Sequence, residues 1–181
     1  MKPQTILFAV AGLLLFAFTA ATTATSKPDF SGTWELDQTK SHSIPPDMKQ
    51  TMTVVQEGDK VSVETRIVTA QGERVVRDSF MLDGKEVEFT PPAPRPQPQE
   101  QQPPTTNAAP PAPKGKRAAR WLPNGNGFVV EEEIKTETPQ GTTTALIARK
   151  WIIWADGTLT IEILQEDHRG SFSSKRAFVK K

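Results

Sequence analysis

The pattern that most constrains this chain is an alternation of apolar and polar residues that recurs, with interruptions, over residues 52–179. Residues 61–67 show it clearly, because valine and isoleucine alternate there with polar side chains. A period of two places successive side chains on opposite faces, so each run predicts a half-buried β-strand. Turn residues such as Asp83-Gly84 separate the runs, which is typical of hairpins. The sequence therefore predicts an all-β protein without helices.

Short strands joined in series by tight turns predict an antiparallel meander. Such a meander removes its edges most simply by closing into a barrel, here of about 8–10 strands. A sandwich of two sheets is the alternative architecture. The expected strands cover residues 52–56, 61–67, 76–82, 87–89, 117–122, 128–136, 142–154, 159–163 and 172–179, after a first strand that opens near Gly32.

The first 26 residues have the order of a secretory signal. Lys2 supplies the positive charge, an unbroken apolar run covers residues 6–18, and small residues follow. We expect cleavage near Ala24 or Ser26 and a periplasmic or secreted protein. An uncleaved anchor is the alternative, but the run is shorter than the roughly 20 residues of a spanning helix. We therefore expect no stable membrane insertion after cleavage.

Charge and cysteine content restrict the partners of the domain at residues 27–181. The chain has 22 basic and 21 acidic residues, and removing Lys2 with the signal leaves the two equal. A general nucleic-acid binder would show a basic excess, so no nucleic acid is expected. The chain has no cysteine, so burial alone must hold it together. We expect a monomer.

A proline-rich insert interrupts the strand pattern. From Pro91 to Pro113, ten of 23 residues are proline and few large apolar residues accompany them. Proline removes ladder donors, and a segment without apolar residues cannot offset the entropy of ordering. We expect a disordered insert over residues 91–116, with strands resuming at about Arg117. The basic residues around its end predict a solvated flank or, alternatively, a site for an anionic polymer or lipid head group.

Four charged residues fall on strand faces that are otherwise apolar. Burying a charge without a partner is costly, so each must pair, reach water or meet a ligand. One interpretation is a bulge or a set of internal salt bridges, and the other is a cavity whose arginines hold an acidic head group. The four are Asp78, Glu132, Arg149 and Arg176, and the candidate ligand-binding residues are Arg149, Arg176, Trp151, Phe80, Phe128 and Glu132.

The sequence contains little that suggests catalysis. His42 and His168 lie in expected loops without a second histidine at ligand spacing, so neither a metal site nor a cofactor is expected. Neither histidine is flanked by a recognisable nucleophile turn. The acidic run at 131–133 alternates between faces on a strand, which indicates a solvated surface rather than a paired carboxylate site. We expect no catalytic residues and no enzyme activity.

The segment at 29–41, Asp-Phe-Ser-Gly-Thr-Trp-Glu-Leu-Asp-Gln-Thr-Lys-Ser, resembles the opening of a group of uncharacterised bacterial secreted proteins with a lipocalin-like domain. Its Gly-x-Trp resembles the opening of lipocalins. The hairpins at 82–86 and 151–157 are similar to others of the same group. The resemblance implies a lipocalin-like barrel, from which this chain departs by the proline-rich insert. The group has no established activity to transfer.

The resemblance also implies a role for Trp34. In lipocalins the tryptophan of the first strand plugs the closed end of the barrel and a late arginine covers it. We therefore expect the first and last strands to pair and Arg176 to lie against Trp34. A ligand-stacking surface is the alternative role of Trp34.

These observations predict an exported lipocalin-like protein that binds a small apolar or amphiphilic molecule. The alternative is a cell-envelope or extracellular interaction module without a ligand cavity, for which the proline-rich insert is the docking segment. A cavity between the strands would favour the first function, and a filled interior would favour the second.

Overall fold

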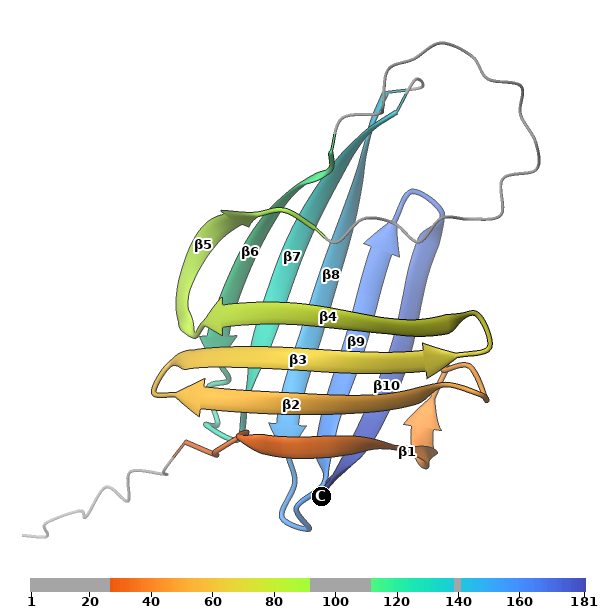
Figure 1. The fold of residues 1–181 in the computed structure, drawn as a ribbon. Coiled ribbons are helices and arrows are strands. Elements are labelled where there is room, and N and C mark those ends of the chain that lie inside the picture. Colours follow the sequence, from red (N-terminus) through yellow and green to blue (C-terminus); the bar gives the residue numbers. More distant parts are fainter. Residues whose placement is uncertain (1–26, 92–111, 139–140) are drawn as a thin grey trace, which may run out of the picture.

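The computed structural model describes residues 27–91, 112–138 and 141–181, which form ten antiparallel strands (Figure 1). The expected signal and most of the insert lie outside these residues. Within the described ranges, no helix is long and apolar enough to cross a membrane. The strands are β1 (Gly32–His42), β2 (Lys49–Glu57), β3 (Lys60–Thr69), β4 (Gly72–Met81), β5 (Asp83–Phe89), β6 (Lys114–Trp121), β7 (Gly127–Thr138), β8 (Gly141–Ile153), β9 (Leu159–Asp167) and β10 (Gly170–Lys180).

One continuous sheet contains all ten strands, in the order β4-β3-β2-β1-β10-β9-β8-β7-β6-β5. Strands β1 and β10 pair, with Trp34 opposite Lys180, so the expected pairing of the first and last strands is confirmed. Strands β4 and β5 are consecutive in the chain but form the two edges of the described sheet. The barrel is therefore nearly closed, and its seam lies between β4 and β5.

The sheet folds over on itself to form two facing layers. Strands β1–β4 run across strands β5–β10, and the two layers meet where β1 joins β10 (Figure 1). Because a single hydrogen-bonded sheet supplies both layers, the architecture is a flattened barrel rather than a sandwich of two separate sheets. The inner faces of the two layers enclose the core.

Large aromatic side chains fill one end of the barrel. Phe30, Phe128 and Phe178 are fully buried there, and Trp34 is 2% exposed. The Trp34 indole Nε1 donates a hydrogen bond to the carbonyl of Phe30 at 2.9 Å, so the ring buries its polar atom with a partner. The expectation that Trp34 belongs to a plug is confirmed. We call this group of aromatic residues the aromatic plug.

The prediction that Arg176 covers Trp34 was wrong. The ammonium of Lys180 lies 5.4 Å from the centre of the Trp34 ring, where Arg176 was expected. The reason is the register, because Lys180 is the residue directly opposite Trp34. Arg176 lies four residues before Lys180 on β10, which is about 13 Å along a strand.

The sequence analysis also predicted too late an end for the proline-rich insert. Strand β6 begins at Lys114, whereas strands were expected to resume at about Arg117. Its first residues are held on both sides, because Gly115 pairs with Phe89 of β5 and with Ile134 of β7. A Cβ atom at Gly115 would overlap the Phe89 ring, so a glycine is required for this close packing.

Candidate ligand-binding cavity

A cavity of about 350 Å³ lies between the two layers and borders the aromatic plug. Its wall combines aliphatic and aromatic side chains with a cluster of charged ones. The exposed residues Arg74 and Phe172 also line it, which places them at its rim. The apolar part of the wall includes Val63, Val76, Phe80, Trp151, Ile161 and Ile163.

Strand register brings the charged residues together on the inner face. Arg117 of β6 is the direct cross-strand partner of Glu132 of β7. On β8, Arg149 pairs with Val130, which lies two residues from Glu132 on the same face of β7. Glu132 is thus flanked by an arginine on each neighbouring strand.

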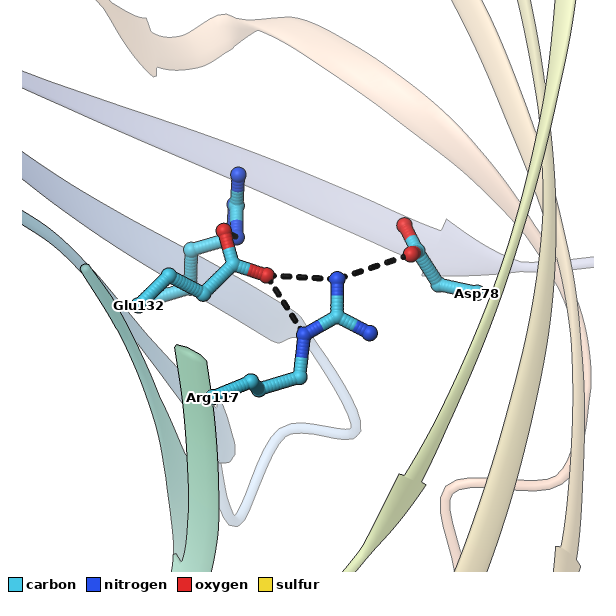
Figure 2. A network of polar contacts seen from close by, with 4 residues as sticks. Asp78, Arg117 and Glu132 are labelled. Carbon is cyan, nitrogen blue, oxygen red and sulfur yellow. Dashed lines mark hydrogen bonds and ion pairs between the residues drawn. The ribbon is translucent and has the colours of Figure 1, made fainter. Parts of the chain in front are cut away.

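These side chains form a chain of ion pairs (Figure 2). Nε and Nη2 of Arg117 each lie 2.6 Å from Oε1 of Glu132, and the same Nη2 donates to Oδ1 of Asp78 at 3.0 Å. Nη1 of Arg149 donates to Oε2 of Glu132 at 2.5 Å. The Glu132 side chain is only 2% exposed, but both of its oxygens accept a hydrogen bond from a guanidinium. The cost of burying this carboxylate is therefore offset by two charged partners.

Arg117 also spans the seam of the barrel. Its guanidinium carbon lies 4.9 Å from the centre of the Phe80 ring and 4.1 Å from that of Phe89. Asp78 and Phe80 belong to β4, whereas Phe89 belongs to β5. Stacking and hydrogen bonding by one side chain thus link the two edge strands where no backbone ladder does.

Arg176 has a different environment from Arg117. Its Nη1 donates to the neutral Oε1 of Gln50 at 3.0 Å, and its Nε is buried without a hydrogen-bond partner in the described part of the chain. Burial lowers the pKa of Arg176, and the positive charges of Arg149 and Arg74 lower it further. No carboxylate among the described residues pairs with it.

A second buried donor without an acceptor lies on the same wall. The Trp151 side chain is in the cavity wall and the residue is 4% exposed, yet its Nε1 has no partner among the described residues. The Phe128 ring stacks on it from the aromatic plug, with ring centres 5.2 Å apart and an angle of 17° between the planes. This contact fixes the indole and leaves its N–H available.

The cavity carries an excess of positive charge. Four of the side chains that line it are arginines and only two are carboxylates. Within the described ranges, no group of three or more histidine, aspartate or glutamate residues is arranged to hold a metal ion. The arrangement suits the retention of a molecule with an apolar body and an acceptor group.

Five of the six candidate residues from the sequence line the cavity. They are Phe80, Glu132, Arg149, Trp151 and Arg176, and they come from four different strands. Phe128 does not line it, because its fully buried ring lies beneath Trp151 in the aromatic plug.

The polar residues of the cavity that sequence reasoning missed include Gln50, Arg74, Arg117 and Gln165. Arg117 was assigned to the solvated basic flank of the insert. A signal for its true position was present, because Arg117 alternates with Ala119 and Trp121 and therefore shares their inward face. Internal ion pairs are present at Asp78, Glu132 and Arg149, and a cavity lies beside them. That its arginines hold an acidic head group stays a prediction.

Comparisons with known proteins give a limited answer. No family model matches the chain, and no curated protein matches it. Among solved structures, the chain is similar to the zebrafish ileal bile acid-binding protein in complex with cholic acid, at 16% identity and a TM-score of 0.46, over 84% of this chain and 98% of that one. It is also similar to the fatty-acid-binding protein of Manduca sexta, at 15% identity and a TM-score of 0.40, over 84% and 100% of the two chains. Likenesses of this extent leave the function to be argued from the cavity itself.

Proposed function

We propose that this protein binds a small apolar or amphiphilic molecule, without catalysis, in the cavity between its two layers. The observation that carries the proposal is a cavity of about 350 Å³ with an apolar wall and a cluster of arginines. Ligand pockets range over about 300–1,000 Å³ and combine apolar walls with a few polar groups. The volume suits one small ligand. Export to the periplasm or the exterior is part of the proposal and rests on residues 1–26.

The ion pairs are compatible with a binding role, because the charged side chains pair with one another and the cavity beside them stays open. Arg117 and Arg149 satisfy Glu132 from opposite sides, so this carboxylate is occupied as an acceptor. An interaction module without a cavity would instead be expected to fill its interior with side chains. The space in this barrel lies next to a tightly packed aromatic plug, so it is not a result of loose packing throughout the core.

Uptake of a neutral solvatochromic dye tests the proposal. We expect the protein to bind the dye and to shift its emission to shorter wavelength, because the cavity wall is apolar. Val76→Trp places an indole in the cavity and should abolish uptake. Val75→Trp is the matched control, because Val75 is next to Val76 in the chain but is 44% exposed on the outer face of the same strand.

Two results would contradict the proposal. One is failure of the folded wild-type protein to take up any neutral or charged amphiphilic probe. The other is equal loss of uptake in the two tryptophan variants, with both folded by circular dichroism. Native mass spectrometry of protein purified from its own host adds an independent test, since a co-purifying small molecule would identify the ligand directly.

A further inference from the structure

We infer that the ligand carries one carboxylate, which binds deep in the cavity between Arg149 and Arg176 and accepts a hydrogen bond from Nε1 of Trp151. The inference rests on the proposed function and specifies the class of ligand. It follows from the order of the charges, from the two donors without acceptors, and from the shape of the free edge of Arg176.

The order of the charges favours an anionic ligand. From Asp78 through Arg117 and Glu132 to Arg149, negative and positive groups alternate, and each neighbouring pair is hydrogen-bonded. Beyond Arg149 the alternation fails, because the next charged group toward β10 is Arg176. The Arg149 side chain is 31% exposed and Arg176 is partly buried, so their positive charges repel each other, and a negative group between them would relieve this repulsion.

The donors without acceptors define the chemistry of that group. Nε of Arg176 and Nε1 of Trp151 are both buried N–H groups with no acceptor in the described chain. They lie in one row across the sheet, because Ile161 is the cross-strand partner of both residues. A buried donor left unpaired is destabilising. An ionised acceptor group, which carries no donor of its own, is the complement of such a row.

The free edge of Arg176 favours a planar carboxylate. Nη1 of Arg176 donates its hydrogen bond to Gln50. Nε and Nη2, which share one edge of the guanidinium, make no hydrogen bond with a described residue. This is the edge that binds a carboxylate through two parallel hydrogen bonds. Gln50 has the role of a positioning residue, since its bond to Nη1 holds the guanidinium plane.

The depth of the site sets the orientation of the ligand. Along the inner face of β10, Phe178 is fully buried in the aromatic plug, whereas Phe172 is 53% exposed at the rim. Arg176 lies close to the buried end of this series. A carboxylate bound there would leave the apolar tail to extend along Val76 and Ile163 toward the rim. The ligand would therefore enter with its head group first.

Three probes with the same ten-carbon tail test the inference: decanoate, decanol and decyltrimethylammonium. We expect decanoate to bind the wild-type protein about tenfold or more tightly than decanol, because hydrogen bonds to charged groups contribute about 1.5–3 kcal/mol each. The cationic probe should bind most weakly. Arg176→Gln should remove the preference for decanoate over decanol. Arg120→Gln is the control, because Arg120 pairs with Glu131 on the outer face.

Trp151→Phe removes the indole donor and keeps an aromatic ring, and should weaken the binding of decanoate several-fold more than that of decanol. Decanoate labelled with ¹³C at the carboxyl carbon gives a readout that requires no variant. Its pKa when bound to the wild-type protein should fall well below that of the free acid, since neighbouring guanidinium groups favour the ionised form.

The outcomes separate this inference from the proposed function. If none of the three probes binds, the proposed function fails and the inference fails with it. If decanol and decanoate bind equally, or if Arg176→Gln weakens both alike, the cavity binds ligands but the carboxylate site is refuted. An unshifted carboxyl pKa in the bound probe would refute the site even if the Arg176 variant fails to fold.

Discussion

Arg117 and Arg176 are the same residue type on the inner face of the same barrel, but their surroundings differ. Arg117 contacts two carboxylates and two aromatic rings. Arg176 contacts the neutral side chain of Gln50 and keeps a buried N–H without a partner among the described residues. The comparison teaches that a buried charge is informative only together with its partners: Arg117 closes a seam, whereas Arg176 is left with an unused donor edge.

The energetic consequence is that the two arginines should affect stability in opposite directions. Arg117 offsets the burial of Glu132 and links β4 to β5 and β6. For Arg176, a lowered pKa means that folding disfavours the charged form. At neutral pH, where the guanidinium is charged in the unfolded chain, this burial costs folding free energy. The cost is tolerated if the residue serves a ligand.

The largest effect is expected for Arg117→Met. Removing one member of a buried ion pair leaves an uncompensated charge and typically costs about 3–5 kcal/mol. Because Arg149 still reaches Glu132, we expect a loss of about 3 kcal/mol in the free energy of unfolding. Denaturant unfolding followed by circular dichroism measures it. Arg120→Met, which breaks an exposed pair, should cost no more than about 1 kcal/mol, and equal losses would contradict a special role for Arg117.

Arg176→Met should have a smaller effect of the opposite sign. Replacing a buried charge that lacks an acid with an apolar side chain of similar length removes the desolvation cost, so we expect the ligand-free protein to gain about 1 kcal/mol. The same denaturant experiment measures this gain. A loss comparable with that of Arg117→Met would show that Arg176 has a structural role and would remove the contrast between the two residues.

The strands and much of the cavity wall were predictable from the sequence, because both depend on the alternation of apolar and polar residues along each strand. A strand with one buried face must repeat every two residues, so the inward position of Glu132 or Arg149 can be read from its apolar neighbours. Arg117 obeys the same rule, but the adjacent proline-rich segment obscured the start of its strand. Of the two carboxylates that pair with it, Glu132 lies on the adjacent strand β7, but Asp78 comes from β4 at the far edge of the described sheet. Pairing with such a distant strand is not visible in local sequence.

Two features of the barrel could not be derived from local sequence. The seam between β4 and β5 lies at Asp83-Gly84, which predicts a hairpin turn, but in the structure the two strands do not pair. The contact expected between Trp34 and Arg176 depended on the register of β1 against β10. That register shifts between Asp37 and His42, so β1 bends away before it can present a regular partner to Arg176.

The smallest effect concerns the plug rather than the cavity, and it tests whether the two regions are independent. Lys180 lies over Trp34, so the variants Trp34→Phe and Lys180→Ala should show a coupling energy of about 0.5–1 kcal/mol, the size of an exposed cation–π contact. Trp34→Phe and Arg176→Met should instead add within about 0.5 kcal/mol, because they lie about 13 Å apart along the strand direction. Double-mutant cycles from denaturant unfolding measure both quantities. A strong coupling of Trp34 with Arg176 would mean that the plug responds to the charge in the cavity, and ligand binding would then be expected to change the packing at the closed end.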